Sequence, residues 1–303
     1  MIAAIGISVL DTIMVMDGFK SAEGSYHCEK LIIEGGGMAA TALCTASKLG
    51  SQTRLFSRIG NDVFGKRLLE ELRDFGVDIS GTITLKNRNT TASVVFVDLN
   101  TGEKQFYSEW DKSAYIDSCS LNVNLLEGVK IMLVDGHWTE GAYEGLVWAR
   151  AQEIPVVADF KRKYNGIEKL FPFIDYFIIP MFFAEEITGE KKTDRMLHKL
   201  TELQPGIPVI TCGVQGGAYI VENDIKRYKA FPIKAVDSTG AGDAFHGAFC
   251  HFISHGVELS RCLELSSAVG ALNCRAHGGR SALPSREELK VFLKNHNVDP
   301  EFP

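Results

Sequence analysis

Short runs of β-branched and aromatic residues alternate along this chain with segments whose apolar residues recur at helical spacing. This alternation is typical of a parallel sheet whose strands are joined by crossover helices, so it predicts an α/β fold. The segments with strand character are 3–9, 54–58, 131–134, 156–159, 176–179 and 209–211. The segments with helical character are 39–48, 66–75, 142–151 and 195–203, and each ends near a glycine or a proline.

One region departs from this pattern and predicts a second, smaller sheet. Its strand-like segments are 13–19, 26–33, 90–98 and 104–110. The last two flank a turn at 100–103, which indicates a hairpin inside an otherwise α/β chain. We therefore expect one domain over residues 1–303, with a β lid formed by about 12–34 and 88–112.

Composition and charge narrow the class of protein. An apolar content of 45% with 23% charged residues is ordinary for a globular chain, and no stretch is long enough to span a membrane. The net charge of −6 argues against a nucleic-acid partner but leaves room for a local basic pocket that holds a phosphate. The seven cysteines show no zinc spacing, which favours reduced thiols. The apolar start contains Asp11 and no basic residue before it, so we expect a cytoplasmic protein without a secretory signal.

Three glycine-rich stretches are candidates for binding a phosphate. The first, GNDVFGKR at 60–67, has the spacing of a nucleotide P-loop, but that loop needs Ser or Thr where Arg67 stands. The second, EGGGMAATALCTASKLG at 34–50, opens a helix of small residues, and its glycines either admit a ligand or only allow tight packing. It lies too far after the first strand for a dinucleotide fingerprint, so NAD is not expected.

The third stretch, DSTGAGDAFHGA at 237–248, places two glycines and an aspartate at the start of a helix. Unpaired N–H groups and the helix dipole make such a helix start a site for anions. Asp243, in the first turn, is either a capping residue or a base. Phosphoryl transfer needs both parts, because N–H groups stabilise charge on the phosphoryl group while a carboxylate accepts the proton of the attacking hydroxyl.

Taken together, these motifs resemble those of the PfkB/ribokinase family of carbohydrate kinases. DSTGAGDAFHGAF resembles the family's C-terminal signature, and GGGMAATALCTASKLG resembles its N-terminal signature. Gly6 with Asp11, GNDVFG at 60–65 and TCGVQGG at 211–217 extend the likeness over the whole chain. The resemblance implies a ribokinase-like α/β fold, a mainly parallel sheet flanked by helices with a small β lid. It also implies a sugar kinase that uses ATP and Mg²⁺ and forms a homodimer through the lid.

The same resemblance assigns roles to individual residues. Asp243 corresponds to the catalytic base, and Gly240, Ala241 and Gly242 to the anion hole. The residues expected to bind the substrate are Asp11, Gly36, Gly37, Thr41, Asp135 and His137. Those expected on the nucleotide side are Lys161, Lys163, Thr211, Gly213, Gly216 and Asn273. Asp237, which precedes the anion hole, would lie near a monovalent cation such as K⁺.

The chain also departs from the family pattern. Thr41 stands where the family usually has Asn, which puts the sugar specificity in doubt. The NxxE motif, which organises Mg²⁺ in the family, would fall at Pro180 to Phe183, and neither residue can perform that role. Glu185 or Glu186 would have to compensate from the next turn, unless each is an ordinary surface acid.

Finer likenesses bear on the substrate. GISVLD and CRAHGGRSALP look most like the branch that contains sulfofructose kinase and ketohexokinase, so the expected acceptor is a ketose or a related sugar. Ser25, Ser108 and His137 stand where sulfofructose kinase would need its sulfonate ligands, so a sulfonate would lack charge-assisted donors. Two alternatives stay open: a nucleoside kinase of the same fold, and a non-catalytic sugar or nucleotide sensor, which the missing NxxE acid would suit.

Overall fold

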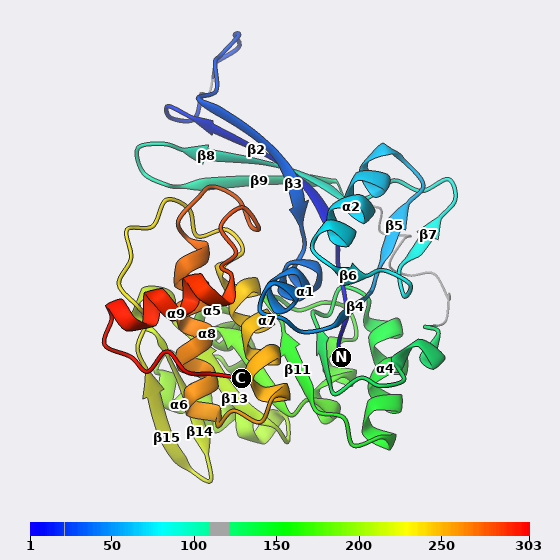
Figure 1. Ribbon diagram of the computed structural model, residues 1–303, viewed down its shortest axis with the longest axis vertical. Coiled ribbons are helices and arrows are strands. Elements are labelled where there is room, and N and C mark those ends of the chain that lie inside the picture. Colours follow the sequence, from blue (N-terminus) through cyan, green and yellow to red (C-terminus); the bar gives the residue numbers. More distant parts are fainter. Residues whose placement is uncertain (21, 110–120) are drawn as a thin grey trace.

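The structure, a computed structural model, describes residues 1–20, 22–109 and 121–303 and contains a nine-stranded central sheet (Figure 1). Its strands are β1 (Ile2–Ile5), β4 (Thr53–Phe56), β6 (Val77–Asp78), β10 (Ile131–Val134), β11 (Val156–Asp159), β12 (Tyr176–Pro180), β13 (Ile207–Thr211), β14 (Gly217–Val221) and β15 (Asp224–Tyr228). They lie in the order β15-β14-β13-β12-β11-β10-β1-β4-β6. Every pair from β13 to β6 is parallel, and the last two strands add an antiparallel hairpin at one edge.

Helices cover both faces of this sheet, because residues along each strand point alternately to the two sides. Ala4 and Leu133 belong to the buried cluster on one face, whereas Ala3 and Met132 belong to the cluster on the other. The helices of the first face are α1 (Met38–Lys48), α7 (Ala241–Ser254), α8 (Leu259–Asn273) and α9 (Arg286–Asn295). Those of the second are α4 (Thr139–Ala151), α5 (Met181–Thr188) and α6 (Thr193–Leu203).

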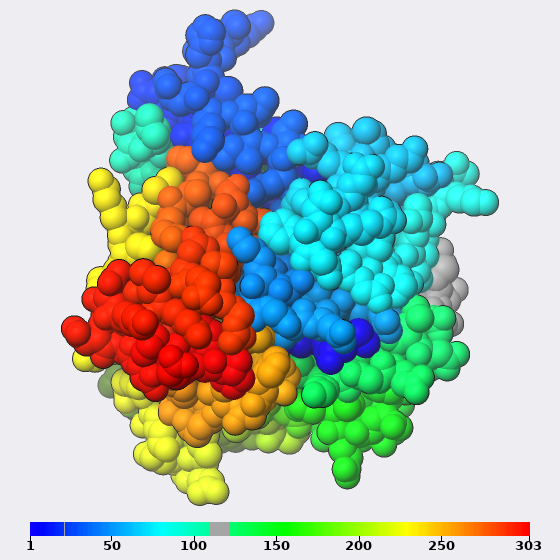
Figure 2. Space-filling model, in the orientation of Figure 1, coloured from blue at the N-terminus to red at the C-terminus, as the bar shows by residue number. Residues whose placement is uncertain are grey.

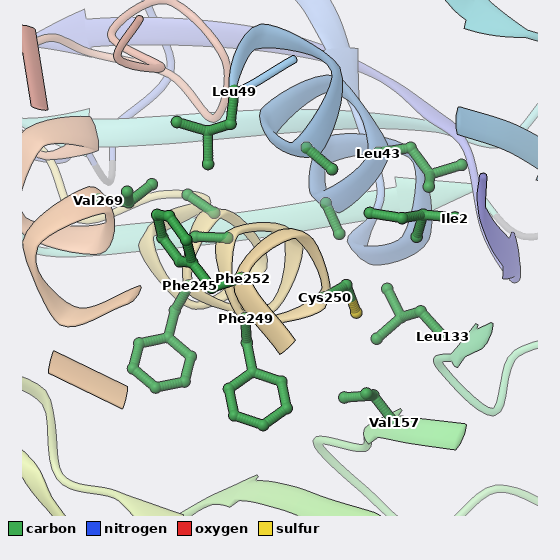
Figure 3. Packing of buried hydrophobic residues seen from close by; sticks show 14 of the residues in the cluster. Ile2, Leu43, Leu49, Leu133, Val157, Phe245, Phe249, Cys250, Phe252 and Val269 are labelled. Atoms are coloured by element: carbon green, nitrogen blue, oxygen red, sulfur yellow. The ribbon is translucent and has the colours of Figure 1, made fainter. Parts of the chain in front are cut away.

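Helix α7 lies at the centre of the first cluster (Figure 3). Its residues Phe249 and Phe252 are fully buried, and the figure shows them between the neighbouring helices and the sheet residues. A Cβ atom on Gly247 would come within 2.0 Å of the Ala42 carbonyl oxygen, so the backbones of α1 and α7 touch. This close packing fixes both helix starts beside the carboxyl ends of the parallel strands.

A four-stranded sheet projects from the body and has the strand order β3-β2-β8-β9 (Figures 1 and 2). Its strands are β2 (Val9–Met16), β3 (Lys30–Gly36), β8 (Ala92–Asp98) and β9 (Lys104–Glu109). One face carries a small buried cluster that includes Ile13 and Val95. Trp110 and the rest of the expected lid segment after Glu109, up to 112, lie outside the described residues. That this sheet closes over a ligand as a lid stays a prediction.

A short parallel pair, β5 (Arg58–Gly60) with β7 (Ile83–Leu85), and helix α2 (Val63–Asp74) connect the two sheets. The predicted α/β class with a mainly parallel sheet is confirmed, but the segment expected as one strand over 3–9 is divided. A Cβ atom on Gly6 would come within 2.2 Å of the Asp135 carboxyl group, so any larger residue at this position would clash with that group. There the chain leaves the large sheet and enters the small one.

Two further findings concern the chain as a whole. In the described ranges, no helix is both long and apolar enough to cross a membrane. The six cysteines that the structure describes, which exclude Cys119, are all free thiols.

Candidate active site

The glycines at the start of α7 have different tasks. Gly240 has φ +71°, and a Cβ atom there would come within 2.6 Å of the Gly279 carbonyl oxygen, so this position requires glycine. A Cβ atom on Gly242 would meet no described atom within 4 Å. By their place in the first turn, the N–H groups of Gly242 and Asp243 have no acceptor within the helix. This helix start is therefore open to an anion.

Asp243 is held by a lysine from a different strand. Lys161 follows the end of β11, and its Nζ lies 2.5 Å from Asp243 Oδ1. The Asp243 side chain is only 11% exposed, whereas that of Lys161 is 34% exposed. Burial would lower the pKa of Lys161, but the charges of Asp243 and Asp159 outweigh it and raise that pKa. Lys161, expected on the nucleotide phosphates, thus contacts the expected base.

A buried histidine lies one turn after Asp243 in the same helix. His246 Nδ1 lies 2.7 Å from the Gly242 carbonyl oxygen, and Nε2 lies 3.1 Å from that of Ile178. Asp159, buried at the end of β11, has its Oδ2 3.4 Å from Nδ1. His246 therefore ties the first turn of α7 to the sheet.

Asp11 faces the same region from the small sheet. A Cβ atom on Gly36 would come within 2.0 Å of Asp11 Oδ2, so the glycine leaves room for the carboxyl group. Burial raises the pKa of Asp11 to about 7, while Arg280 opposes the shift and the charges of Glu34 and Asp243 add to it. The structure thus brings Asp11 next to Gly36 and close enough to Asp243 for their charges to interact.

The glycine triplet before α1 is clamped by an arginine and a glutamate. The Gly35 N–H donates to both Glu71 carboxylate oxygens, at 2.9 and 2.8 Å. Arg280, only 3% exposed, donates to Glu71, to the Gly36 carbonyl at 2.7 Å and to the Thr41 hydroxyl at 3.1 Å. Thr41 is itself 1% exposed. The expectation that Thr41 binds the substrate is therefore corrected: its hydroxyl is bonded inside the protein.

Asp135 also has a structural task instead of the expected one. One of its oxygens accepts hydrogen bonds from the N–H groups of Ile7 and Ala39, at 2.8 and 3.2 Å. The other accepts from the backbone and lies 3.2 Å from the ring of His137, whose Nε2 lies 2.9 Å from the Tyr164 hydroxyl. Burial would raise the pKa of Asp135, but these partners outweigh it and lower that pKa. Neither Asp135 nor His137 has a polar atom left to offer a sugar.

Gly37 and the GNDVFG loop at 60–65 both have roles in packing the chain. Gly37 has φ +93°, and a Cβ atom there would come within 2.5 Å of the Ile7 carbonyl oxygen. In GNDVFG, the Asp62 carboxylate accepts hydrogen bonds from the Gly65 N–H at 2.8 Å and from the backbone and hydroxyl of Thr90 at 2.7 and 2.6 Å. This loop ties α2 to the small sheet, which agrees with the rejection of a P-loop there.

The expected nucleotide side lies at the end of β13. Thr211 is the last residue of that strand, and the turn after it contains Gly213 with φ +56° and Gly216 with φ +85°. At Gly216 a Cβ atom would come within 2.1 Å of the Tyr228 carbonyl oxygen, whereas at Gly213 it would meet no described atom within 4 Å. Gly213 is thus the more open position, and a nucleotide contact there stays a prediction.

Two other residues expected near the nucleotide have different surroundings. Asn273 is fully buried, and its amide donates to the backbone carbonyls of Thr239 and Gly279, at 3.2 and 3.0 Å. It therefore braces the anion-hole turn, which corrects its assignment as a nucleotide ligand. Lys163 is exposed, so its contact with phosphates stays a prediction. Glu185 pairs with Lys191, as an ordinary surface acid does.

Asp237 also has a partner that sequence reasoning missed. Lys104, the first residue of β9, places its Nζ 2.5 Å from Asp237 Oδ1. The same ammonium lies 3.2 Å from the Ser238 hydroxyl. Arg280 was missed as well, although it lies in a quoted stretch. Strand alternation puts Lys104 and Asp11 on one face of the small sheet. Nothing in the sequence, however, shows which carboxylate Lys104 or Arg280 contacts.

Comparisons with known proteins find relatives over nearly the whole chain. The model of the pfkB family carbohydrate kinases matches residues 1–286. A nucleoside kinase of Methanothermobacter thermautotrophicus is 24% identical over 306 residues, which cover 98% of this chain and 97% of that protein. Among solved structures, a provisionally named ribokinase of Agrobacterium tumefaciens is 26% identical, with a TM-score of 0.92 and 98% of each chain covered. A provisionally named ribokinase II of E. coli, solved with ATP and Mg²⁺, is 21% identical, with a TM-score of 0.82 and coverage of 97% and 99%.

Proposed function

Since this chain belongs to the pfkB family of carbohydrate kinases, we propose that it transfers the γ-phosphoryl group of ATP to a sugar hydroxyl with Asp243 as general base. The observation that carries this assignment is that Asp243 lies at an open helix start, close enough to Asp11 on the small sheet for their charges to interact. A sugar held by Asp11 would present a hydroxyl to Asp243, while the phosphoryl group approaches the free N–H groups.

The proposed step needs one proton acceptor and one anion site. Asp243 accepts the proton as the acceptor O–H bond breaks and the new O–P bond forms, while the bond from phosphorus to the leaving ADP oxygen breaks. The N–H groups of Gly242 and Asp243 stabilise the negative charge on the transferred group. Lys161 keeps Asp243 oriented through their 2.5 Å ion pair, which makes it a positioning residue.

The described side chains provide few ligands for Mg²⁺. Within the described ranges, no group of three or more His, Cys, Asp or Glu side chains is arranged to hold a metal. Pro180 and Phe183, at the places of the NxxE motif, carry no side-chain ligand atom, and Phe183 is fully buried. A magnesium ion that accompanies ATP would therefore be held by the phosphates and water rather than by a protein cage.

For the acceptor we propose a free sugar, a ketose or a related sugar, rather than a nucleoside. The face of the small sheet that carries Asp11 also carries Glu34, Ser93 and Ser108, and the two serine hydroxyls lie 2.8 Å apart. These polar side chains suit the hydroxyl groups of a sugar, which both donate and accept hydrogen bonds. A nucleoside kinase is the second candidate, because one such enzyme is similar over 98% of this chain.

The outer face of the small sheet supports a homodimer. Leu31 and Ile33 on β3 are 54% and 44% exposed, and Tyr107 on β9 is 60% exposed. Ile33 and Tyr107 lie in register across the sheet, so they form part of one apolar surface. A second copy of the chain would bury this surface. Light scattering that finds only monomers at micromolar concentration would remove this part of the proposal.

The activity is tested by coupling ADP release from ATP to a panel of ketoses, pentoses, polyols and nucleosides. We expect turnover with at least one free sugar and a kcat/KM at least tenfold lower with every nucleoside. Asp243→Asn, assayed in parallel, is the control for contaminating kinases. No transfer to any acceptor, despite measurable ATP binding, would favour the sensor alternative instead.

A further inference from the structure

Lys104 is an unusual cation because it belongs to the small sheet but contacts the loop before α7. Its Nζ lies 2.5 Å from Asp237 Oδ1 and 3.2 Å from the Ser238 hydroxyl. Its side chain is 16% exposed and that of Asp237 is fully buried, so the ion pair is shielded from solvent. Gly240, the first glycine of the proposed anion hole, follows three residues after Asp237. A charge at this point therefore acts directly on the catalytic turn.

The Asp237 carboxylate accepts several hydrogen bonds from the chain around it. Oδ1 accepts hydrogen bonds from the N–H and hydroxyl of Thr239, both at 2.8 Å, and Oδ2 accepts from the Gly278 N–H at 2.9 Å. Burial would raise the pKa of Asp237, but Lys104 and these backbone donors outweigh it and lower that pKa. The carboxylate thus joins the turn at 237–239 to the loop at 278 while it is ionised.

A monovalent cation does not fit this arrangement. The family resemblance implied a monovalent cation such as K⁺ beside Asp237, and a potassium ion would need one of the carboxylate oxygens as a ligand. Lys104 already places one positive charge on Oδ1, and a second cation beside it would be repelled. His277 Nδ1 lies 4.0 Å from the second carboxylate oxygen, Oδ2.

We propose that the Lys104 ammonium takes the place of the monovalent cation at Asp237, so that turnover in this enzyme does not depend on K⁺. Unlike a dissolved ion, this charge is attached to β9 of the small sheet. It therefore reaches the catalytic turn only when the small sheet lies over the site. The proposal concerns the same site as the proposed function, but it can be tested separately from the identity of the acceptor.

The test compares the wild-type protein with Lys104→Ala in 100 mM KCl and in 100 mM tetramethylammonium chloride. The wild type should turn over at rates within about twofold in the two salts. Lys104→Ala should lose about 10–100-fold in kcat in tetramethylammonium, and K⁺ or NH₄⁺ should restore at least about tenfold. Lys104→Arg, which keeps the charge, should stay independent of K⁺. Lys30→Ala, an exposed lysine of the same sheet, should behave as the wild type.

A second readout does not require activity. In the absence of substrates, KCl should raise the melting temperature of Lys104→Ala by about 2–4 °C over tetramethylammonium chloride, and leave that of the wild type unchanged. Failure of the sugar panel would leave this measurement intact, so the two proposals can fail independently. A wild type that requires K⁺, or a folded Lys104→Ala variant that K⁺ neither stabilises nor reactivates, would overturn the proposal.

Discussion

The two carboxylates that face the proposed sugar site, Asp243 and Asp11, come from opposite ends of the chain and are held in different ways. Asp243 lies at a helix start with a lysine ammonium 2.5 Å away. Asp11 lies in the middle of a strand, and burial raises its pKa to about 7 despite the nearby Arg280. The same side chain is thus paired with a cation in one region and is half-protonated near neutral pH in the other.

This difference teaches how one site obtains two functions from one residue type. An ionised Asp243 only accepts, which is what a base for a hydroxyl proton requires. An Asp11 that titrates near neutrality can donate to one sugar oxygen and accept from another hydroxyl. Partners in three dimensions, rather than the residues themselves, set this division.

The strongest test of the comparison removes the charge of Asp243. Asp243→Asn keeps the shape but cannot accept the proton, so kcat should fall by about 10³–10⁴-fold. The affinity for ATP, measured by calorimetry, should change less than about threefold, because the helix N–H groups stay in place. An asparagine variant within tenfold of the wild-type rate would show that Asp243 is only a capping residue.

The next test removes the partner of Asp243. Lys161→Met should lower kcat by about 10²-fold, because the carboxylate loses the cation that orients it. Steady-state kinetics at saturating ATP and sugar measures this effect. Lys199→Met, at an exposed position of α6, is the matched control and should leave kcat unchanged. Equal rates for the two variants would mean that Lys161 has no part in positioning the base.

The smallest expected effect concerns Asp11 and pH. Its pKa in the folded state, about 7, lies above the ordinary value of 3.8, so the folded protein binds a proton more tightly than the unfolded chain. Stability therefore falls as pH rises from about 4 to about 7, and Asp11→Asn removes this loss. Since Asp11 is partly exposed, screening reduces the gain, and we expect about 1–3 kcal/mol at pH 8.

Urea denaturation of Asp11→Asn and the wild type at pH 5 and pH 8 measures that gain. The difference in unfolding free energy between the two proteins should be larger at pH 8. A difference that is the same at both pH values would mean that Asp11 titrates normally in the folded protein.

Much of the architecture could be predicted from the sequence. The segments 131–134 and 156–159 were predicted with the bounds that the structure gives them. Errors occurred where a strand crosses between sheets: the run at 3–9 is apolar except for Ser8, and the packing of Gly6 on Asp135 divides it. Local patterns record the period of a strand, but not which sheet it joins.

The site was predictable to the extent that its motifs are local. The predicted turn before Asp243 lies at a helix start as expected, because glycines, helix period and carboxylate are all within a few residues. Thr41, Asp135 and Asn273 were expected to face ligands and instead bond inside the protein. A polar residue in a motif shows that its group is needed, but not whether the partner is a ligand or the chain itself.

By itself the sequence determined the alternating α/β architecture, the open helix start and the aspartate beside it, because each depends on neighbours along the chain. Only the tertiary structure decided which cation serves which carboxylate. Lys161 with Asp243, Lys104 with Asp237 and Arg280 with Glu71 join residues 82, 133 and 209 positions apart. Ion pairs of this kind form where tertiary packing buries two opposite charges next to each other. No local sequence pattern shows which two residues will be in contact.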